Sequence, residues 1–201
     1  MLDGPLRRFV DPPLDRLGAR LAKAGFSANF LTLAGFGVGL LALPFLSASE
    51  YGLALIAILL NRFVDGLDGA VARARGASDW GGYLDIVCDF IFYGAVVFGF
   101  ALADGENRLP AGFLLLSFIG TGGSFLAFAA LATRRGIETT ARGAKSLYYL
   151  GGLTEGTETI VFFLACCLFP ESFPVLAWIF AAACWITTAS RVVTAGMLLR
   201  G

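Results

Sequence analysis

The segment that decides the fold carries five aspartates, and four of them lie within two predicted membrane spans. From residue 65 to residue 89 it reads DGLDGAVARARGASDWGGYLDIVCD. Asp65 and Asp68 are separated by one helical turn, and so are Asp85 and Asp89, so each pair lies on one face of its helix. Two antiparallel helices joined by the short connection between these pairs would bring all four carboxylates into one layer. That layer would lie roughly 6–12 Å inside the ends of the two helices, at about 1.5 Å per residue.

The sequence around this segment is that of a membrane protein. Of the 201 residues, 57% are hydrophobic and 15% are charged, which excludes an ordinary soluble domain and a disordered chain. Hydropathy predicts six transmembrane helices, because a span needs roughly 20 mostly apolar residues. They are expected at Phe30–Ser47, Tyr51–Ala72, Gly82–Ala103, Pro110–Thr133, Tyr148–Phe169 and Pro174–Leu199. We therefore expect an all-α integral membrane protein with one domain over residues 1–201, in which residues 28–201 form a six-helix bundle.

Residues 1–27, which precede the first span, are predicted to form an amphipathic helix on the membrane surface. Leu14, Leu17 and Leu21 recur at helical spacing, while Arg16 and Arg20 occupy the other face. A plain positively charged topology signal explains the same residues equally well.

The charge distribution predicts the orientation of the chain. Twelve basic residues fall on one side of the predicted spans: Arg7, Arg8, Arg16, Arg20, Lys23, Arg73, Arg75, Arg134, Arg135, Arg142, Lys145 and Arg200. The other side has only Arg108, so the positive-inside rule places both termini and the aspartate layer on the cytoplasmic side of the inner membrane. The formal net charge of zero gives no electrostatic footprint for nucleic acid.

The aspartate layer predicts a site for a hard divalent cation. A carboxylate at membrane depth costs about 2.5–3.5 kcal/mol, so four of them need compensating cations. The chain has no histidine and the layer offers oxygen donors, which favours Mg²⁺ or Mn²⁺. On residue types alone, an ion-coupled secondary transporter that uses intramembrane acids is an equal alternative.

The order of these residues closely resembles the signature of the CDP-alcohol phosphotransferase (phosphatidyltransferase) family, D-x-x-D-G-x-x-A-R-x₈-G-x-x-x-D-x-x-x-D. Every fixed residue is present, from Asp65 to Asp89. Seven residues instead of eight separate Arg73 from Gly81, and this deletion falls in the connection, where it leaves the phase of both helices intact. Upstream, residues 29–32 (Asn-Phe-Leu-Thr) are similar to the family's Pro-Asn-x-Leu-Thr entry to the first span, with Ala28 in place of the proline. The resemblance covers nearly the whole chain and strongly disfavours the transporter.

The resemblance implies a metal-dependent enzyme of phospholipid biosynthesis. Such enzymes transfer a substituted phosphate from a CDP-linked donor, usually CDP-diacylglycerol, to an alcohol and release CMP, and homodimers are expected. By similarity, Asp65, Asp68 and Asp85 hold Mg²⁺ or Mn²⁺ on the donor diphosphate. Asp89 completes the metal shell or takes the proton of the attacking hydroxyl.

The resemblance also implies which residues bind the donor. Arg73 should contact the diphosphate, and Asn29 and Thr32 should line the nucleotide pocket. Gly69 and Gly81 lack side chains where the nucleotide would approach the helices, although helix packing alone also explains Gly69.

Basic residues near the cytoplasmic ends of the last spans suggest the acceptor site. These residues are Arg134, Arg135, Lys145 and the deeply placed Arg191. They favour an anionic acceptor such as a phosphorylated polyol. Glu155 and Glu158 support two alternatives, because they could recognise an amino alcohol or neutralise Arg191 in a purely structural pair.

Overall fold

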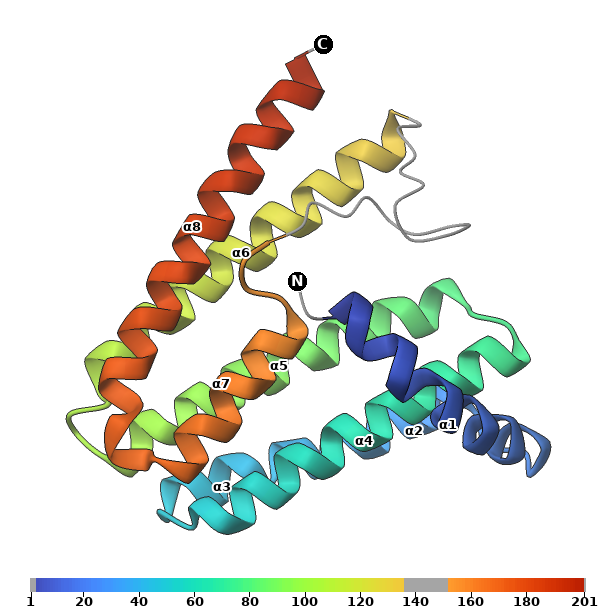
Figure 1. Ribbon diagram of the computed structural model, residues 1–201, viewed down its shortest axis with the longest axis horizontal. Coiled ribbons are helices and arrows are strands. Elements are labelled where there is room, and N and C mark those ends of the chain that lie inside the picture. The colour runs from blue at the N-terminus through green and yellow to red at the C-terminus, as the bar shows by residue number, and fades with distance from the viewer. Residues whose placement is uncertain (1–2, 136–151, 201) are drawn as a thin grey trace.

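The computed structural model describes residues 3–135 and 152–200, and over these residues the chain is helical and has no strand. Figure 1 shows the helices in chain order. They are α1 (Asp3–Lys23), α2 (Ala28–Leu40), α3 (Ala42–Ser47), α4 (Tyr51–Arg75), α5 (Asp79–Ala103), α6 (Arg108–Arg134), α7 (Gly156–Leu168), the short 3₁₀ helix η1 (Pro170–Ser172) and α8 (Phe173–Arg200). The predicted all-α class is confirmed for the described residues.

Four of the predicted spans correspond to long continuous helices, namely α4, α5, α6 and α8. Their starts follow local capping chemistry. The side chain of Ser78 accepts a hydrogen bond from the backbone N–H of Gly81 at the start of α5, over 3.1 Å. Ser27 caps α2 in the same way through the N–H of Phe30, at 3.2 Å. Both caps lie at the end of the bundle that carries the aspartates.

The first predicted span is interrupted, because α2 ends at Leu40 and α3 begins at Ala42. Pro44 explains the break. It has no backbone N–H to offer the carbonyl group of Leu40, and its ring would collide with that group in a straight helix. The two pieces together still form an apolar stretch of 20 residues, Ala28–Ser47.

The fifth predicted span is shorter than expected. The first four residues of this predicted span, 148–151, lie outside the described residues. The helix that the structure describes begins only at Gly156. A capping box fixes this start: the Glu155 side chain accepts from the backbone of Glu158, and the Glu158 side chain accepts from the N–H of Glu155 at 3.1 Å. The 13-residue helix covers about 20 Å, less than the roughly 30 Å of a bilayer core.

Within the described residues, four segments are long and apolar enough to cross a membrane: Ala28–Ser47, Asp79–Ala103, Arg108–Arg134 and Pro170–Leu199. These segments indicate an integral membrane protein. Helix α4 has the necessary length, but Arg62, Asp65 and Asp68 interrupt its apolar sequence. Its charged side chains must therefore be shielded by neighbouring helices.

Four neighbouring helices contact α4. It packs against α1, α2, α3 and α7, while α6 packs against α8 and also against α5 (Figure 1). Helix α1 approaches α4 so closely that a Cβ on Gly18 would lie 2.5 Å from the Cβ of Ala70. The face of α1 that meets α4 thus includes Leu14 and Gly18, whereas Leu17, which was expected on the same apolar face, is 37% exposed.

Candidate functional site

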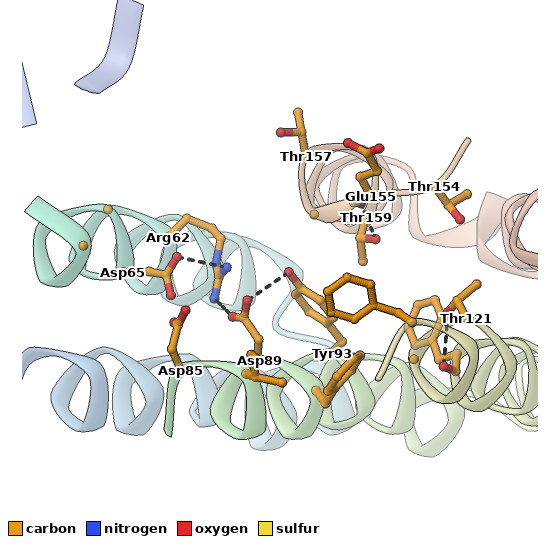
Figure 2. Close-up of a pocket in the computed structure, with 18 of the residues that line it drawn as sticks. Arg62, Asp65, Asp85, Asp89, Tyr93, Thr121, Thr154, Glu155, Thr157 and Thr159 are labelled. Atoms are coloured by element: carbon orange, nitrogen blue, oxygen red, sulfur yellow. Dashed lines mark hydrogen bonds and ion pairs between the residues drawn. The ribbon is translucent and has the colours of Figure 1, made fainter. Parts of the chain in front are cut away.

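Three of the four predicted aspartates form a compact cluster. Asp65 and Asp68 come from α4 and Asp85 comes from α5, and one carboxylate oxygen of each lies within 4.8 Å of the others. Figure 2 shows Asp65 and Asp85 pointing toward one another from the two helices. The one-turn spacing on α4 and the packing of both α4 and α5 against α2 produce this convergence.

The surroundings of Asp68 test whether the cluster suits a metal ion. Asp68 is only 6% exposed, and its Oδ2 atom is buried without a hydrogen-bond partner among the described residues. A buried carboxylate oxygen without a donor is costly, and a cation would satisfy it. Three carboxylates with no nitrogen or sulfur donor form the kind of set that Mg²⁺ and Mn²⁺ prefer. The residues therefore fit a hard divalent ion.

The fourth aspartate, Asp89, is held by other groups. Its Oδ1 atom accepts a hydrogen bond of 2.7 Å from the Nη2 atom of Arg62. Its Oδ2 atom lies 3.5 Å from the hydroxyl of Tyr93 on the same helix. Arg62 also pairs with Asp65 at 3.4 Å, so this arginine stands between Asp89 and the cluster (Figure 2).

Arg62 and Tyr93 are two site residues that were not predicted from the sequence. Arg62 lies near the middle of α4, and a cation at that place in an apolar helix was a usable signal. It precedes Asp65 by three residues, which puts both on one face of the helix. Tyr93 follows Asp89 by four residues and had no such signal, because tyrosine is common in apolar helices.

The predicted donor-binding residues surround the smaller of two cavities at the cluster. This cavity of about 330 Å³ is lined by Asn29, Thr32, Gly69 and Gly81, together with Asp68 and Asp85. The structure thus brings together four of the five residues predicted for the donor. A Cβ on Gly81 would lie 3.0 Å from the Oδ1 atom of Asn29, so the lack of a side chain there permits the close approach of α2 and α5.

Arg73, the fifth predicted donor residue, does not line this cavity. Its guanidinium donates two hydrogen bonds to the Oδ1 atom of Asp15 on α1, and its side chain is 49% exposed. It lines the larger cavity, as does Asp11. The neighbouring Arg75 donates instead to the carbonyl groups of Gly25 and Phe26.

The larger cavity has a volume of about 560 Å³ and opens on the opposite side of the aspartate cluster. It is lined by residues of α1, α4, α5, α6, α7 and α8. Asp89 and Tyr93 lie on one wall, and Glu155 with three threonines, Thr154, Thr157 and Thr159, lies across from them (Figure 2). The cluster residues Asp68 and Asp85 line both cavities, so the two spaces meet at the carboxylates.

Arg191 lines the larger cavity from α8 and is 7% exposed. Its Nη1 atom donates to the carbonyl oxygen of Thr121 at 3.0 Å, and its guanidinium lies 5.6 Å from the centre of the Phe125 ring. Glu155 lines the same cavity. Glu158, the partner considered in the sequence analysis, contributes its side chain to the capping box of α7.

The other cations predicted for the acceptor do not line either cavity within the described residues. Arg134 and Arg135 are exposed at the end of α6, and Arg135 donates to the carbonyl oxygen of Leu199. Lys145 lies outside the described residues. The structure therefore places Arg191 at the site and the two described arginines near the ends of α6 and α8.

Two solved structures of a phosphatidylinositol phosphate synthase share this fold. The phosphatidylinositol phosphate synthase of Mycobacterium tuberculosis, solved with CDP-DAG bound, superposes with a TM-score of 0.74 at 23% identity, over 90% of this chain and 92% of that one. The same enzyme in complex with manganese and citrate gives a TM-score of 0.72 at 24% identity, over 90% of this chain and 88% of that one.

Relatives in sequence agree with this fold. The inner membrane protein YnjF of Escherichia coli K12 is 54% identical over 96% of this chain and 94% of its own length. The archaetidylinositol phosphate synthase of Pyrococcus horikoshii is 33% identical over 93% of each chain. The family model for CDP-alcohol phosphatidyltransferase matches residues 26–193, which include the aspartate cluster and Arg191 but not α1. The chain belongs to the CDP-alcohol phosphatidyltransferase family.

Proposed function

We propose that this protein transfers a phosphatidyl group from a CDP-linked lipid, CDP-diacylglycerol in the first instance, to the hydroxyl of a small alcohol. The observation that carries the proposal is the carboxylate cluster, which stands where a donor cavity and a second cavity meet. Two reactants held in adjoining cavities could meet at the cluster, as a transfer between them requires. Family membership and the CDP-DAG bound to the mycobacterial synthase support the choice of donor.

Asp65, Asp68 and Asp85 would hold a divalent ion, Mg²⁺ or Mn²⁺. Bound there, the ion would neutralise the charge that develops on the leaving CMP. The donor diphosphate would lie against Gly69, which lines both cavities, and the nucleotide would occupy the space beside Asn29, Thr32 and Gly81. Arg73 lies one turn beyond Gly69 and could reach a phosphate oxygen at the edge of the larger cavity.

Asp89 would accept the proton of the attacking hydroxyl. It faces the larger cavity, and Tyr93 and Arg62 fix its carboxylate. The acceptor oxygen would form a bond to the lipid-linked phosphorus, the bond from that phosphorus to the CMP oxygen would break, and the hydroxyl proton would pass to Asp89. The products would be a phospholipid and CMP.

The larger cavity favours an acceptor that carries a phosphate in addition to its hydroxyl. Arg191 supplies a buried cation there, and charge-assisted hydrogen bonds to phosphate are the strongest that it could form. The threonines across the cavity offer hydroxyls that suit a polyol. Relatives named as archaetidylinositol phosphate synthase and phosphatidylinositol phosphate synthase agree with an acceptor of this class. An amino alcohol held by Glu155 remains the competing candidate, because that carboxylate lines the same cavity.

We further propose that both termini and the site face the cytoplasm, that α1 lies along the membrane surface, and that two copies form a dimer. The basic residues of α1 and of the last turn of α4 support this orientation through the positive-inside rule. A single domain would then comprise α1 and a bundle in which α4 and α7 also cross or enter the bilayer, shielded by their neighbours.

The test is an assay of the purified full-length protein with CDP-diacylglycerol, Mn²⁺ and a panel of acceptors, with CMP release as the readout. The panel should include a phosphorylated polyol, the same polyol without phosphate, and an amino alcohol. Acceptor-dependent CMP release confirms the reaction, and the preferred acceptor identifies the chemistry of the larger cavity. Absence of CMP release together with proton- or sodium-driven flux in vesicles would favour a transporter instead.

A further inference from the structure

Arg62 is at the centre of a hydrogen-bond network that joins three helices. All three of its guanidinium nitrogens are used: Nε donates to Asn61 at 2.8 Å, Nη1 pairs with Asp65 at 3.4 Å and Nη2 donates to Asp89 at 2.7 Å. A guanidinium with every nitrogen engaged is fixed in place. It is therefore poorly suited to bind a substrate that comes and goes.

The network is anchored beyond the arginine. Asn61 is 3% exposed and donates from Nδ2 to the carbonyl oxygen of Gly35 on α2, at 2.9 Å. The guanidinium also packs on two rings of α5, with 5.0 Å to the centre of the Phe92 ring and 5.8 Å to that of Tyr93. Helices α2, α4 and α5 thus together determine where Arg62 points.

This geometry separates the four aspartates into two kinds. Asp65, Asp68 and Asp85 each bring a carboxylate oxygen within 4.8 Å of the others, whereas Asp89 is bonded to Arg62 at 2.7 Å, closer than the 3.4 Å between Arg62 and Asp65. A cation bound so closely occupies the side of Asp89 where a metal ion would have to approach. It would also repel a divalent ion that moved from the cluster toward Asp89.

We propose that Arg62 is a positioning residue that serves as the internal counter-cation of Asp89. It keeps the Asp89 carboxylate out of the metal cluster and directs it into the larger cavity, so that three aspartates hold the ion and the fourth receives the acceptor's proton. The part that concerns proton transfer rests on the proposed function. The competition between Arg62 and the metal for Asp89 does not.

Metal binding tests that competition without any catalysis. Mn²⁺ titrations followed by electron paramagnetic resonance should show tighter binding in Arg62→Met than in the native chain, by about threefold or more, because a nearby positive charge has gone and Asp89 can join the cluster. The increase in Mn²⁺ affinity should be smaller in the double variant Arg62→Met/Asp89→Asn. Weaker Mn²⁺ binding in Arg62→Met, comparable to that in Asp68→Asn, would show that Arg62 supports the metal site itself and would overturn the inference.

Turnover tests the positioning role. Arg62→Met should lower kcat by roughly 10²-fold, the scale of general base catalysis, and leave the donor KM nearly unchanged. If Arg62 acts only through Asp89, the double variant should be no slower than Asp89→Asn alone. Arg62→Lys should be more active than Arg62→Met, because lysine keeps the positive charge but cannot form the three hydrogen bonds of the guanidinium at once. Fully additive losses, or an unchanged kcat in Arg62→Met, would refute the assignment.

Arg108→Met is the matched control, since Arg108 is an exposed arginine at the start of α6 and lines neither cavity. If Arg62→Met cannot be produced because Asp89 is left unpaired, the double variant, which lacks both charges, should be produced normally. Failure of the double variant, with Asp89→Asn alone well folded, would mean that Arg62 serves the fold and not Asp89. A native protein that binds Mn²⁺ but releases no CMP would count against the proposed function, and the titrations would still decide the role of Arg62.

Discussion

The guanidinium of Arg73 on α4 donates two hydrogen bonds, of 2.9 and 2.7 Å, to one carboxylate oxygen of Asp15 on α1. This ion pair joins α1 to α4, the helix that carries Asp65 and Asp68 of the aspartate cluster. The close approach of Gly18 to Ala70 lies one turn further along α1. The arginine of the family motif therefore has a structural partner before any donor is bound.

We expect Asp15→Asn to affect the donor more than the fold. The two side chains are 48% and 49% exposed, and an exposed ion pair contributes at most about 1 kcal/mol to stability. Without Asp15, however, the guanidinium is no longer held at the edge of the larger cavity. Donor KM should rise, though less than in Arg73→Ala, while the thermal unfolding temperature should change little. A lower donor KM in Asp15→Asn would instead show that Asp15 competes with the donor for Arg73.

Removal of the metal, or of one of its ligands, should abolish activity. Asp65→Asn and Asp85→Asn each take one carboxylate from the three-residue cluster, and neither leaves an unpaired cation that would harm insertion. We expect both proteins in the membrane fraction at native levels, without CMP release. Excess EDTA should abolish CMP release by the native protein, and added Mn²⁺ should restore CMP release. CMP release that persists in EDTA would contradict a metal-dependent reaction.

The sequence predicted the cluster well because its geometry depends on local rules. The spacing of Asp65 and Asp68 follows from helical periodicity, and the short connection between α4 and α5 brings Asp85 back to the same level. The long helices were predicted within a few residues for the same reason. The break at Leu41 was missed, although Pro44 was visible, because a proline near a helix end is often tolerated.

What the sequence could not show depends on contacts between distant segments. Nothing in the spacing of residues tells that Arg62 reaches Asp89, or that Arg73 is bonded to Asp15 on α1. The predicted grouping of Arg191 with Arg134 and Arg135 relied on their shared cytoplasmic side. In the structure, Arg191 lies in the larger cavity, whereas the other two are exposed at the end of α6.

Gly81 should be needed for donor binding because of its contact with Asn29. A Cβ at this position would lie 3.0 Å from Asn29 Oδ1 and 3.1 Å from Ser78 Oγ, closer than either group tolerates without moving. Gly81→Ala should therefore raise the donor KM and leave the acceptor KM nearly unchanged. Gly112→Ala on α6 is the control, since a Cβ there meets nothing within 4 Å. Equal kinetics in the two variants would show that the α2–α5 contact does not shape the nucleotide site.

We expect Arg191 to contribute more to acceptor binding than Arg135. Arg191 is buried in the larger cavity, whereas Arg135 is exposed and donates to the carbonyl group of Leu199. With a phosphorylated acceptor, Arg191→Ala should raise the acceptor KM strongly and leave the donor KM little changed. Arg135→Ala should have a smaller effect that fades with added salt, because exposed charges act at long range and are screened over about 10 Å at 0.1 M salt.

The uncharged version of the same acceptor supplies the control for this ranking. If Arg191 binds the phosphate, Arg191→Ala should erase the preference for the phosphorylated compound over the uncharged one, and Arg135→Ala should preserve it. Glu155→Gln should leave that preference intact, because the carboxylate does not contact the phosphate. An unchanged preference in Arg191→Ala, together with recovery of its expression by Glu155→Gln, would show that the arginine serves only to neutralise Glu155 within the bundle.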